Sequence, residues 1–206
     1  MRYGFAIDTK RCIGCHTCSV ACHIENNLPE GIWWTSALTE GGEYMDTPKG
    51  VFPNTRMGYI TLACQHCENP ACVKVCPVGA TYKDPETGIV HQDPEKCIGC
   101  RMCMAACPYN GVRSFNWEEP KFHVGHAVGD AAAFTHQKHT VEKCTMCYHR
   151  LAKGEQPMCV TVCLSRARYW GDLDDPESEI SKVILERDYK QLLPEQGTNP
   201  SVYYLV

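Results

Sequence analysis

The chain has 206 residues, a formal net charge of −4 and 16 cysteines. The acidic balance and the lack of a basic stripe argue against nucleic-acid binding, and no stretch reaches the roughly 18 apolar residues of a membrane span. The first eight residues lead directly into a cysteine motif and leave no room for a signal peptide, so we expect the chain to carry no export signal of its own.

The cysteines form four groups of four, with none left over. In chain order they are Cys12/Cys15/Cys18/Cys22, Cys64/Cys67/Cys72/Cys76, Cys97/Cys100/Cys103/Cys107 and Cys144/Cys147/Cys159/Cys163. Groups one and three have the spacing C-x2-C-x2-C-x3-C, which binds cubane [4Fe–4S] clusters in bacterial ferredoxins. Proline follows Cys76 and Cys107, as at the end of that motif. The pattern predicts four [4Fe–4S] clusters and the transfer of single electrons.

Disulfides and zinc are the two other uses of these cysteines. Disulfides suit small secreted chains with irregular spacing, and the triplets here lie too close together for eight bridges. Zinc is the stronger rival, because four all-cysteine sites would also use sixteen thiolates. The spacing of group four, with a long gap between Cys147 and Cys159, is also compatible with a zinc site. The spacing of groups one and three is not.

Two segments between the groups are longer than a ferredoxin needs. The first insertion, residues 28–56, is rich in Gly, Pro and Trp. We expect Trp33 and Trp34 to be exposed there and to contact a partner subunit. The second insertion covers residues 117–139. Between groups two and three, Thr81–Lys83 and Ile89–His91 flank a turn signal and predict a β-hairpin.

The lengths of the connecting segments indicate which groups pair. Residues 77–96 between groups two and three form the shortest connection, of 20 residues, against 41 and 36 for the other two. We expect groups two and three to form an inner ferredoxin-like unit and groups one and four to meet around it. The predicted fold class is α+β with two nested bacterial-ferredoxin-like dicluster units: an outer unit of residues 1–27 and 140–175, an inner unit of 57–116, loop insertions at 28–56 and 117–139, and a C-terminal helix and extended tail at 176–206.

In two-cluster ferredoxins the fourth cysteine of each motif binds the other cluster. The predicted ligand sets are therefore crossed, and no catalytic residue is predicted. They are Cys12, Cys15, Cys18 and Cys163 for cluster 1; Cys22, Cys144, Cys147 and Cys159 for cluster 2; Cys64, Cys67, Cys72 and Cys107 for cluster 3; and Cys76, Cys97, Cys100 and Cys103 for cluster 4.

The C-terminal region predicts one helix, with Asp175 as N-cap and Pro176 as its first residue. Ile180, Val183 and Ile184 recur at helical spacing and predict a packing face. The residues after Leu193 are expected to form an extended tail.

The histidines are not expected to bind iron. Those beside the cysteines, His16, His66 and His149, are expected to tune cluster potentials. Those of the second insertion are expected to be solvated or to lie at an interface: His123, His126, His136 and His139. The chain has no phosphate-binding loop, no nucleophile–base motif and no flavin, nicotinamide or molybdopterin site, which places substrate chemistry on another polypeptide.

Over nearly its whole length, the chain resembles the iron–sulfur electron-transfer subunit of molybdopterin oxidoreductases of the dimethyl sulfoxide reductase type. Several stretches look especially like its polysulfide and arsenate reductase branch. They are MRYGFAIDTKRCIGC, CQHCENPACVKVCPVGATYKD, CIGCRMCMAACPY, KCTMCYHRLAKGEQPMCV, GDLDDPES and LLPEQGTNPSVYYL.

The resemblance implies a large catalytic subunit with a molybdenum or tungsten bis-molybdopterin cofactor, and often a polytopic membrane subunit that exchanges electrons with quinol. The catalytic subunit usually has a twin-arginine signal, so the complex is expected on the extracytoplasmic side of a membrane, with the cytoplasm as the alternative. Cluster 1 would face the catalytic subunit and cluster 4 would lie at the far end. Some relatives have tryptophan where this chain has Cys100, and relatives commonly have proline in place of Leu164.

Two other functions stay open at this point. One is a stand-alone soluble polyferredoxin that serves a hydrogenase or a formate dehydrogenase, although such a carrier needs neither the insertions nor the tail. The other is a zinc-scaffolded binding module.

Overall fold

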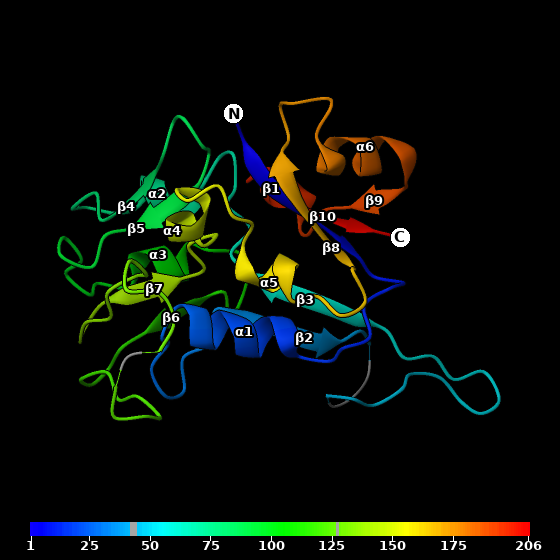
Figure 1. The fold of residues 1–206 in the computed structure, drawn as a ribbon, viewed down its shortest axis with the longest axis horizontal. Helices are drawn as coiled ribbons and strands as arrows, with labels where there is room; N and C mark the ends of the chain where they lie inside the picture. The colour runs from blue at the N-terminus through cyan, green and yellow to red at the C-terminus, as the bar shows by residue number, and fades with distance from the viewer. Residues whose placement is uncertain (42–44, 127) are drawn as a thin grey trace.

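A four-stranded sheet joins the two ends of the chain (Figure 1). Its strands, in the order β8-β1-β10-β9, are β8 (Arg168–Asp172), β1 (Tyr3–Asp8), β10 (Val202–Leu205) and β9 (Tyr189–Lys190). The computed structural model describes residues 1–41, 45–126 and 128–206; residues 42–44 and 127, which fall within the two predicted insertions, lie outside the described residues. The combination of short helices and small sheets is an α+β fold.

The end of the chain is not a peripheral tail, contrary to the expectation from the sequence. β10 pairs in parallel with β1, with Phe5 opposite Val202, and β1 pairs antiparallel with β8. The side chains of Tyr204 and Leu205 are fully buried. Val202–Leu205 is extended as predicted, but Pro194–Gln196 forms a 3-10 helix, and the burial of the strand between β1 and β9 was not predicted.

Three two-stranded antiparallel sheets make up the rest of the β-structure. They pair β2 (Thr35–Thr39) with β3 (Tyr59–Ala63), β4 (Thr81–Lys83) with β5 (Val90–Gln92), and β6 (Arg113–Phe115) with β7 (Val141–Lys143). The β4–β5 hairpin confirms the predicted one. In its turn the Asp84 carboxylate accepts hydrogen bonds from the Glu86 backbone N–H and the Thr87 hydroxyl.

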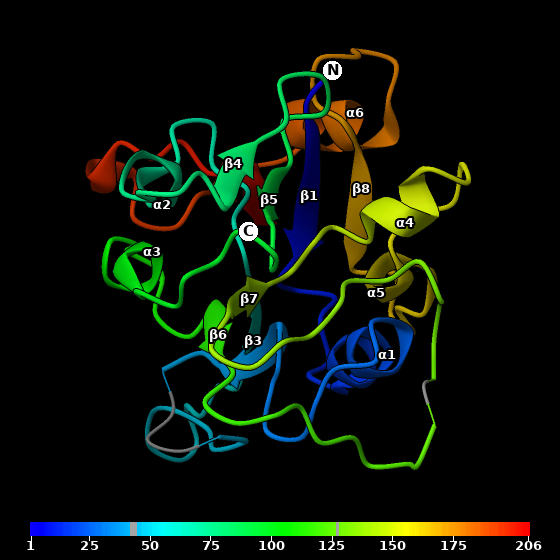
Figure 2. The same ribbon diagram turned by 90° about the vertical axis from the view of Figure 1, so that its left-hand side faces the viewer.

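The helices are short. They are α1 (Thr17–Glu25), α2 (Ala71–Lys74), α3 (Met102–Ala105), α4 (Tyr148–Leu151), α5 (Met158–Thr161), α6 (Glu179–Glu186) and the 3-10 helix η1 (Pro194–Gln196). Helix α1 packs beside α5, and α2 packs beside α3 (Figure 2). Segments far apart in the sequence are thus brought together in pairs. No helix in the described part of the chain is long and apolar enough to cross a membrane.

Helix α6 begins later than the sequence predicted. Its N-cap is Ser178, whose hydroxyl accepts a hydrogen bond from the Ser181 backbone N–H at 3.3 Å. The Asp175 carboxylate accepts instead from the Glu177 N–H at 2.9 Å, which forms a turn before the helix. The predicted packing face is correct, because Ile180 is buried with Ala6 and Leu205.

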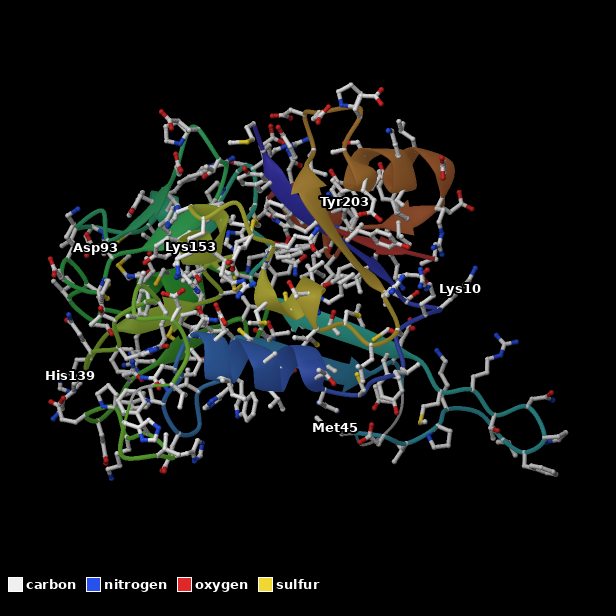
Figure 3. The ribbon with its side chains drawn as sticks, viewed as in Figure 1. Lys10, Met45, Asp93, His139, Lys153 and Tyr203 are labelled. Atoms are coloured by element: carbon white, nitrogen blue, oxygen red, sulfur yellow. The ribbon has the colours of Figure 1, made fainter. Side chains whose placement is uncertain are left out.

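An arm of residues 45–58 projects from the body between β2 and β3 (Figure 1), with Met45 labelled near its start in Figure 3. Two backbone hydrogen bonds between Lys49 and Arg56 hold its strands together. At its tip Val51 is 82% exposed and Phe52 is 86% exposed.

Leu205→Ala should lower the free energy of unfolding by about 2–5 kcal/mol, because it leaves a cavity between the sheet and α6. Anaerobic urea unfolding of the iron-loaded protein, followed by circular dichroism, measures the change. Leu185→Ala on α6 is the matched control, since Leu185 is 81% exposed, and should change the free energy by less than about 0.5 kcal/mol. Equal effects of the two substitutions would show that β10 does not contribute to the core.

Candidate iron–sulfur sites

Each cysteine group presents its thiols from a loop and from the helix after it. The third cysteine is the second residue of a helix in all four groups: Cys18 in α1, Cys72 in α2, Cys103 in α3 and Cys159 in α5. The fourth cysteine follows four residues later, about one helical turn onward. The first three thiols can therefore surround one centre, while the fourth is carried away from it.

Three cavities are lined by four cysteines each. Site 1 is lined by Cys12, Cys15, Cys18 and Cys163. Site 2 is lined by Cys22, Cys144, Cys147 and Cys159. Site 4 is lined by Cys76, Cys97, Cys100 and Cys103. In each cavity, three thiols come from one group and one comes from another.

The remaining four cysteines, which we call site 3, also lie together. The thiols of Cys67 and Cys107 each interact electrostatically with those of Cys64 and Cys72. Three of these cysteines belong to group two, whereas Cys107 belongs to group three. The structure thus brings together all sixteen cysteines in the crossed sets expected from the sequence, and none forms a disulfide.

The four sites follow one another in numerical order. Cys18 of site 1 and Cys159 of site 2 share one hydrophobic cluster with Phe5 and Met146. Cys22 and Cys144 of site 2 share a second cluster with Cys64 of site 3. A third cluster holds Cys72 of site 3 and Cys103 of site 4. Each pair of neighbouring sites is therefore joined by closely packed apolar side chains.

The spacing of the thiols fits a core larger than a single ion. Within the described residues, only Glu25, Asp130 and His149 place three metal-ligand atoms within 4.8 Å of one another, and no three thiols do so. A zinc ion with Zn–S bonds of about 2.3 Å would hold its sulfur atoms about 3.8 Å apart. A cubane, by contrast, takes one thiolate at each of four iron corners, which lie further apart.

Burial raises the pKa of eight of the sixteen thiols. It raises the pKa of Cys67 and Cys144 to about 12 and that of Cys107 to about 11, with further increases from neighbouring thiolates. Cys15 is an exception, because hydrogen bonds from Thr17 lower its pKa. Ligation requires the thiolate form, so metal binding has to supply the positive charge that removes these protons.

The loops of groups one and three have matching backbone conformations. Gly14 and Gly99 stand between the first two cysteines and have φ of 65° and 69°. A Cβ atom at Gly14 would clash with the Tyr59 ring, and one at Gly99 with the carbonyl oxygen of His139. His16 and Arg101, two residues further on, also have positive φ, at 57° and 59°. The cysteine spacing that groups one and three share is therefore matched by a shared backbone structure.

Three buried cations lie among the sites and were not singled out from the sequence. Arg168 lines the cavity of site 1. Arg113 interacts electrostatically with thiols of sites 3 and 4. The Lys143 ammonium donates hydrogen bonds to the carbonyl oxygens of Val90 and Cys144. The only sequence signal that could have identified them is their position. Arg113 and Arg168 follow the fourth cysteine of a group, and Lys143 directly precedes the first cysteine of group four.

Two expectations about aromatic residues in the insertions are wrong. Trp34, which was expected to be exposed, is only 2% exposed, and its indole N–H donates a hydrogen bond to Glu142. Trp33 is 44% exposed, in agreement with the expectation. His136 is buried as well, with hydrogen bonds to Glu142 and to the Asn26 carbonyl oxygen. Burial lowers the pKa of His136, but the hydrogen bonds to Glu142 and Asn26 and the charge of Glu142 together raise it above its usual value. The second insertion is thus anchored in the core.

The histidines beside the cysteines occupy buried positions in two of three cases. His66 accepts a hydrogen bond from the Val90 N–H, and burial together with Lys143 holds its pKa well below the usual value. His149 contacts the Glu25 carboxylate at 3.0 Å. His16 lines the cavity of site 1. An effect of these histidines on cluster potential stays a prediction.

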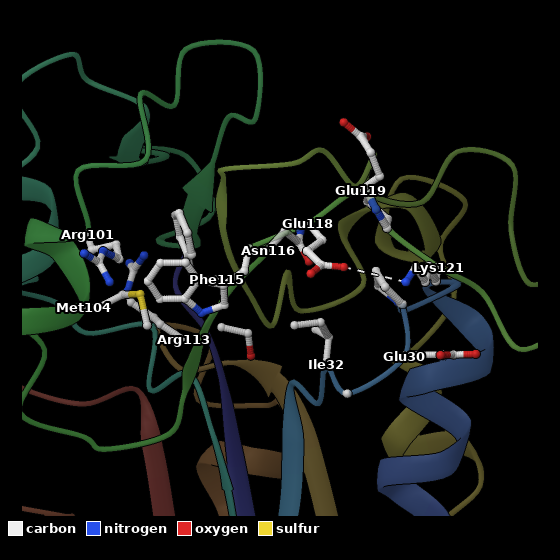
Figure 4. Close-up of a pocket in the computed structure, with 15 residues that line it drawn as sticks. Glu30, Ile32, Arg101, Met104, Arg113, Phe115, Asn116, Glu118, Glu119 and Lys121 are labelled. Carbon is white, nitrogen blue, oxygen red and sulfur yellow. Dashed lines mark ion pairs between the residues drawn. The ribbon is translucent and has the colours of Figure 1, made fainter.

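The most exposed cysteines lie at the two ends of the row of sites. Among the sixteen cysteines, all of which are described, Cys15 of site 1 and Cys100 of site 4 are the exposed ones. Exposed apolar side chains surround both: Ile13 and Leu164 near the first, Ile98 and Met102 near the second. Beside site 4, Arg101 and Phe115 line a surface groove (Figure 4), and the Arg101 guanidinium stacks on Trp117 at 4.6 Å.

Comparisons with known proteins agree with this geometry. Residues 55–124 and 130–173 match the family described as 4Fe-4S dicluster domain. Residues 9–31 match the family described as 4Fe-4S binding domain. The matched segments include all four cysteine groups.

Relatives match over nearly the whole chain. A protein of Halobacterium salinarum assigned as an iron–sulfur subunit of a dimethyl sulfoxide reductase is 52% identical, over 98% of this chain and 78% of its own length. The iron–sulfur subunit of the arsenate respiratory reductase of Shewanella sp. is 41% identical, over 100% and 96%. A tetrathionate reductase subunit of Salmonella typhimurium is 40% identical, over 99% and 72%.

Gly14→Ala should reduce the iron and acid-labile sulfide content by about one cluster per chain, because the new Cβ displaces Tyr59 or the cysteine loop. Gly125→Ala is the matched control, since nothing lies within 4 Å of a Cβ there. Colorimetric iron and sulfide analysis of the two variants measures the difference. A fully loaded Gly14→Ala protein would contradict this account of the loop.

Proposed function

The chain belongs to the family of iron–sulfur electron-transfer subunits found in complexes of the dimethyl sulfoxide reductase type, with four [4Fe–4S] clusters, and from this premise we propose how it holds them and what it connects. The clusters take up and release single electrons when bound. The chain transfers electrons, and substrate conversion takes place on a partner subunit.

We propose that the four cysteines of each site are the ligands of one cluster. Cavities lined by four thiols support this for sites 1, 2 and 4. Mutual electrostatic contact of the thiols supports it for site 3. Cys22, Cys76, Cys107 and Cys163 are then the crossing ligands, each bound to the cluster of another group.

The observation that carries the functional proposal is the order of the sites. Three hydrophobic clusters join site 1 to site 2, site 2 to site 3 and site 3 to site 4. Packed apolar side chains exclude water and keep neighbouring centres close. Electrons would therefore pass along the row, entering or leaving at site 1 and site 4, where Cys15 and Cys100 are exposed.

The chain would consist of two nested ferredoxin-like units with the boundaries given above. The packing of α1 against α5 supports an outer unit of groups one and four, and that of α2 against α3 supports an inner unit of groups two and three. The β6–β7 pair connects the two units. Nesting explains how each unit contributes two sites to one row.

A catalytic subunit with a molybdopterin cofactor is the proposed partner at site 1. A second redox partner, in the simplest case a quinol-handling membrane subunit, would exchange electrons at site 4. The complex would be exported by a twin-arginine signal on the catalytic subunit. The base of the arm lies next to site 1, where the Tyr59 ring is close to Gly14. The apolar tip of the arm supports a permanent partner and disfavours a stand-alone polyferredoxin, which would expose these side chains to water.

Paired substitutions test the crossed ligand sets. If Cys163 and Cys12 bind the same cluster, the Cys163→Ala/Cys12→Ala double variant should lose one cluster. The Cys163→Ala/Cys159→Ala double variant should lose two. Iron and sulfide per chain, measured after anaerobic purification, distinguish the outcomes. Sequential rather than crossed ligation would reverse the two results.

Substitutions in the arm test the partner. Val51→Ser and Phe52→Ser should reduce the amount of large catalytic subunit that co-purifies with the tagged chain, while iron content stays unchanged. Leu185→Ser, which alters an equally exposed leucine on α6, should leave co-purification intact. A native extract in which the unaltered chain is a free monomer would refute the proposed complex.

A further inference from the structure

A strand follows the fourth cysteine of each group. Strands β2, β4, β6 and β8 begin with Thr35, Thr81, Arg113 and Arg168. Thr35 lines the cavity of site 2, and Thr81 lines that of site 4. The first residue of these strands thus faces a cysteine site, and two of the four carry a guanidinium group there.

Arg168 lies between sites 1 and 2. It lines the cavity of site 1 and interacts electrostatically with Cys18 of that site and with Cys159 of site 2. The side chain is buried, with one hydrogen bond from Nη1 to the Thr61 hydroxyl at 3.0 Å. Its Nε is buried and has no partner among the described residues. That N–H is available to a cluster sulfur or a thiolate.

Arg113 holds the corresponding place between sites 3 and 4. It interacts electrostatically with Cys64 and Cys72 of site 3 and with Cys103 of site 4. Nη1 donates to the Gln92 side-chain oxygen at 3.4 Å, while Nη2 is buried without a partner in the described structure. The side chain also forms part of the wall of the groove in Figure 4.

Lys143 is a different case. It lies between sites 2 and 3, next to Cys144, but two backbone carbonyl oxygens already accept hydrogen bonds from its ammonium group. These hydrogen bonds to backbone oxygens account for the burial of the Lys143 ammonium group. Each arginine, by contrast, has a buried nitrogen with no hydrogen-bond partner at all among the described residues, Nε in Arg168 and Nη2 in Arg113.

We propose that Arg168 and Arg113 raise the reduction potentials of the clusters on either side of them, Arg168 at sites 1 and 2 and Arg113 at sites 3 and 4. This inference rests on the proposed ligand sets. Each electron that arrives adds one negative charge to a site. A buried guanidinium, which stays charged at any physiological pH, stabilises that charge because the protein interior screens it weakly. Net charge and hydrogen bonds to sulfur are known determinants of cluster potential.

Redox titration of the iron-loaded full chain, followed by electron paramagnetic resonance, tests the proposal. Arg168→Gln should move two of the four one-electron steps to lower potential and leave the other two unchanged. Arg113→Gln should move the other two. Arg168→Lys and Arg113→Lys keep the charge and should titrate much closer to the unaltered protein.

The outcomes separate this inference from the proposed function. Fewer than four one-electron steps in the unaltered protein would count against the ligand sets. Fully loaded Gln variants with unchanged titrations, or two variants that shift the same steps, would overturn the role of the arginines. If a Gln variant loses iron, the Lys variant decides: a titration like that of the unaltered protein supports the proposal, and one displaced to lower potential overturns it.

Discussion

The bond between a buried thiolate and iron is the interaction on which the rest of this structure depends. Burial raises the pKa of Cys22, Cys144 and Cys147, so these side chains can be thiolates only when a metal compensates their charge. The helices that carry the third cysteines of groups two, three and four have four residues each, which is too short to be stable alone. With the proposed ligand sets, ligation fixes these helices, and the crossing cysteines fix one group against another.

The same crossing links structure to function. Each fourth cysteine leaves its own group one helical turn after the third, and this places thiols of neighbouring sites in a shared apolar cluster. The core of the protein is therefore also the path between redox centres. The four cysteines of site 2 are buried, whereas Cys15 and Cys100 are exposed at the two ends of the row. A protein that accepts electrons from one partner and delivers them to another needs that arrangement.

The sequence predicted what local spacing determines and missed what tertiary packing determines. The cysteine motifs, the β4–β5 hairpin and the packing face of α6 follow from residues close together in the chain. The burial of β10, Trp34 and His136 depends on partners more than 100 residues away, such as Glu142 for Trp34 and Phe5 for Val202. Arg113 and Arg168 look like ordinary surface residues until the fold places them among thiolates.

X-ray diffraction from crystals of the iron-loaded protein, with anomalous data at the iron absorption edge, would locate each cluster among the sixteen cysteines. We expect four separate iron peaks, one in each cysteine site and in the order 1, 2, 3, 4, with the crossing cysteine of another group bound at each. Peaks at the zinc edge, or four peaks each surrounded by the cysteines of one sequential group, would contradict this expectation.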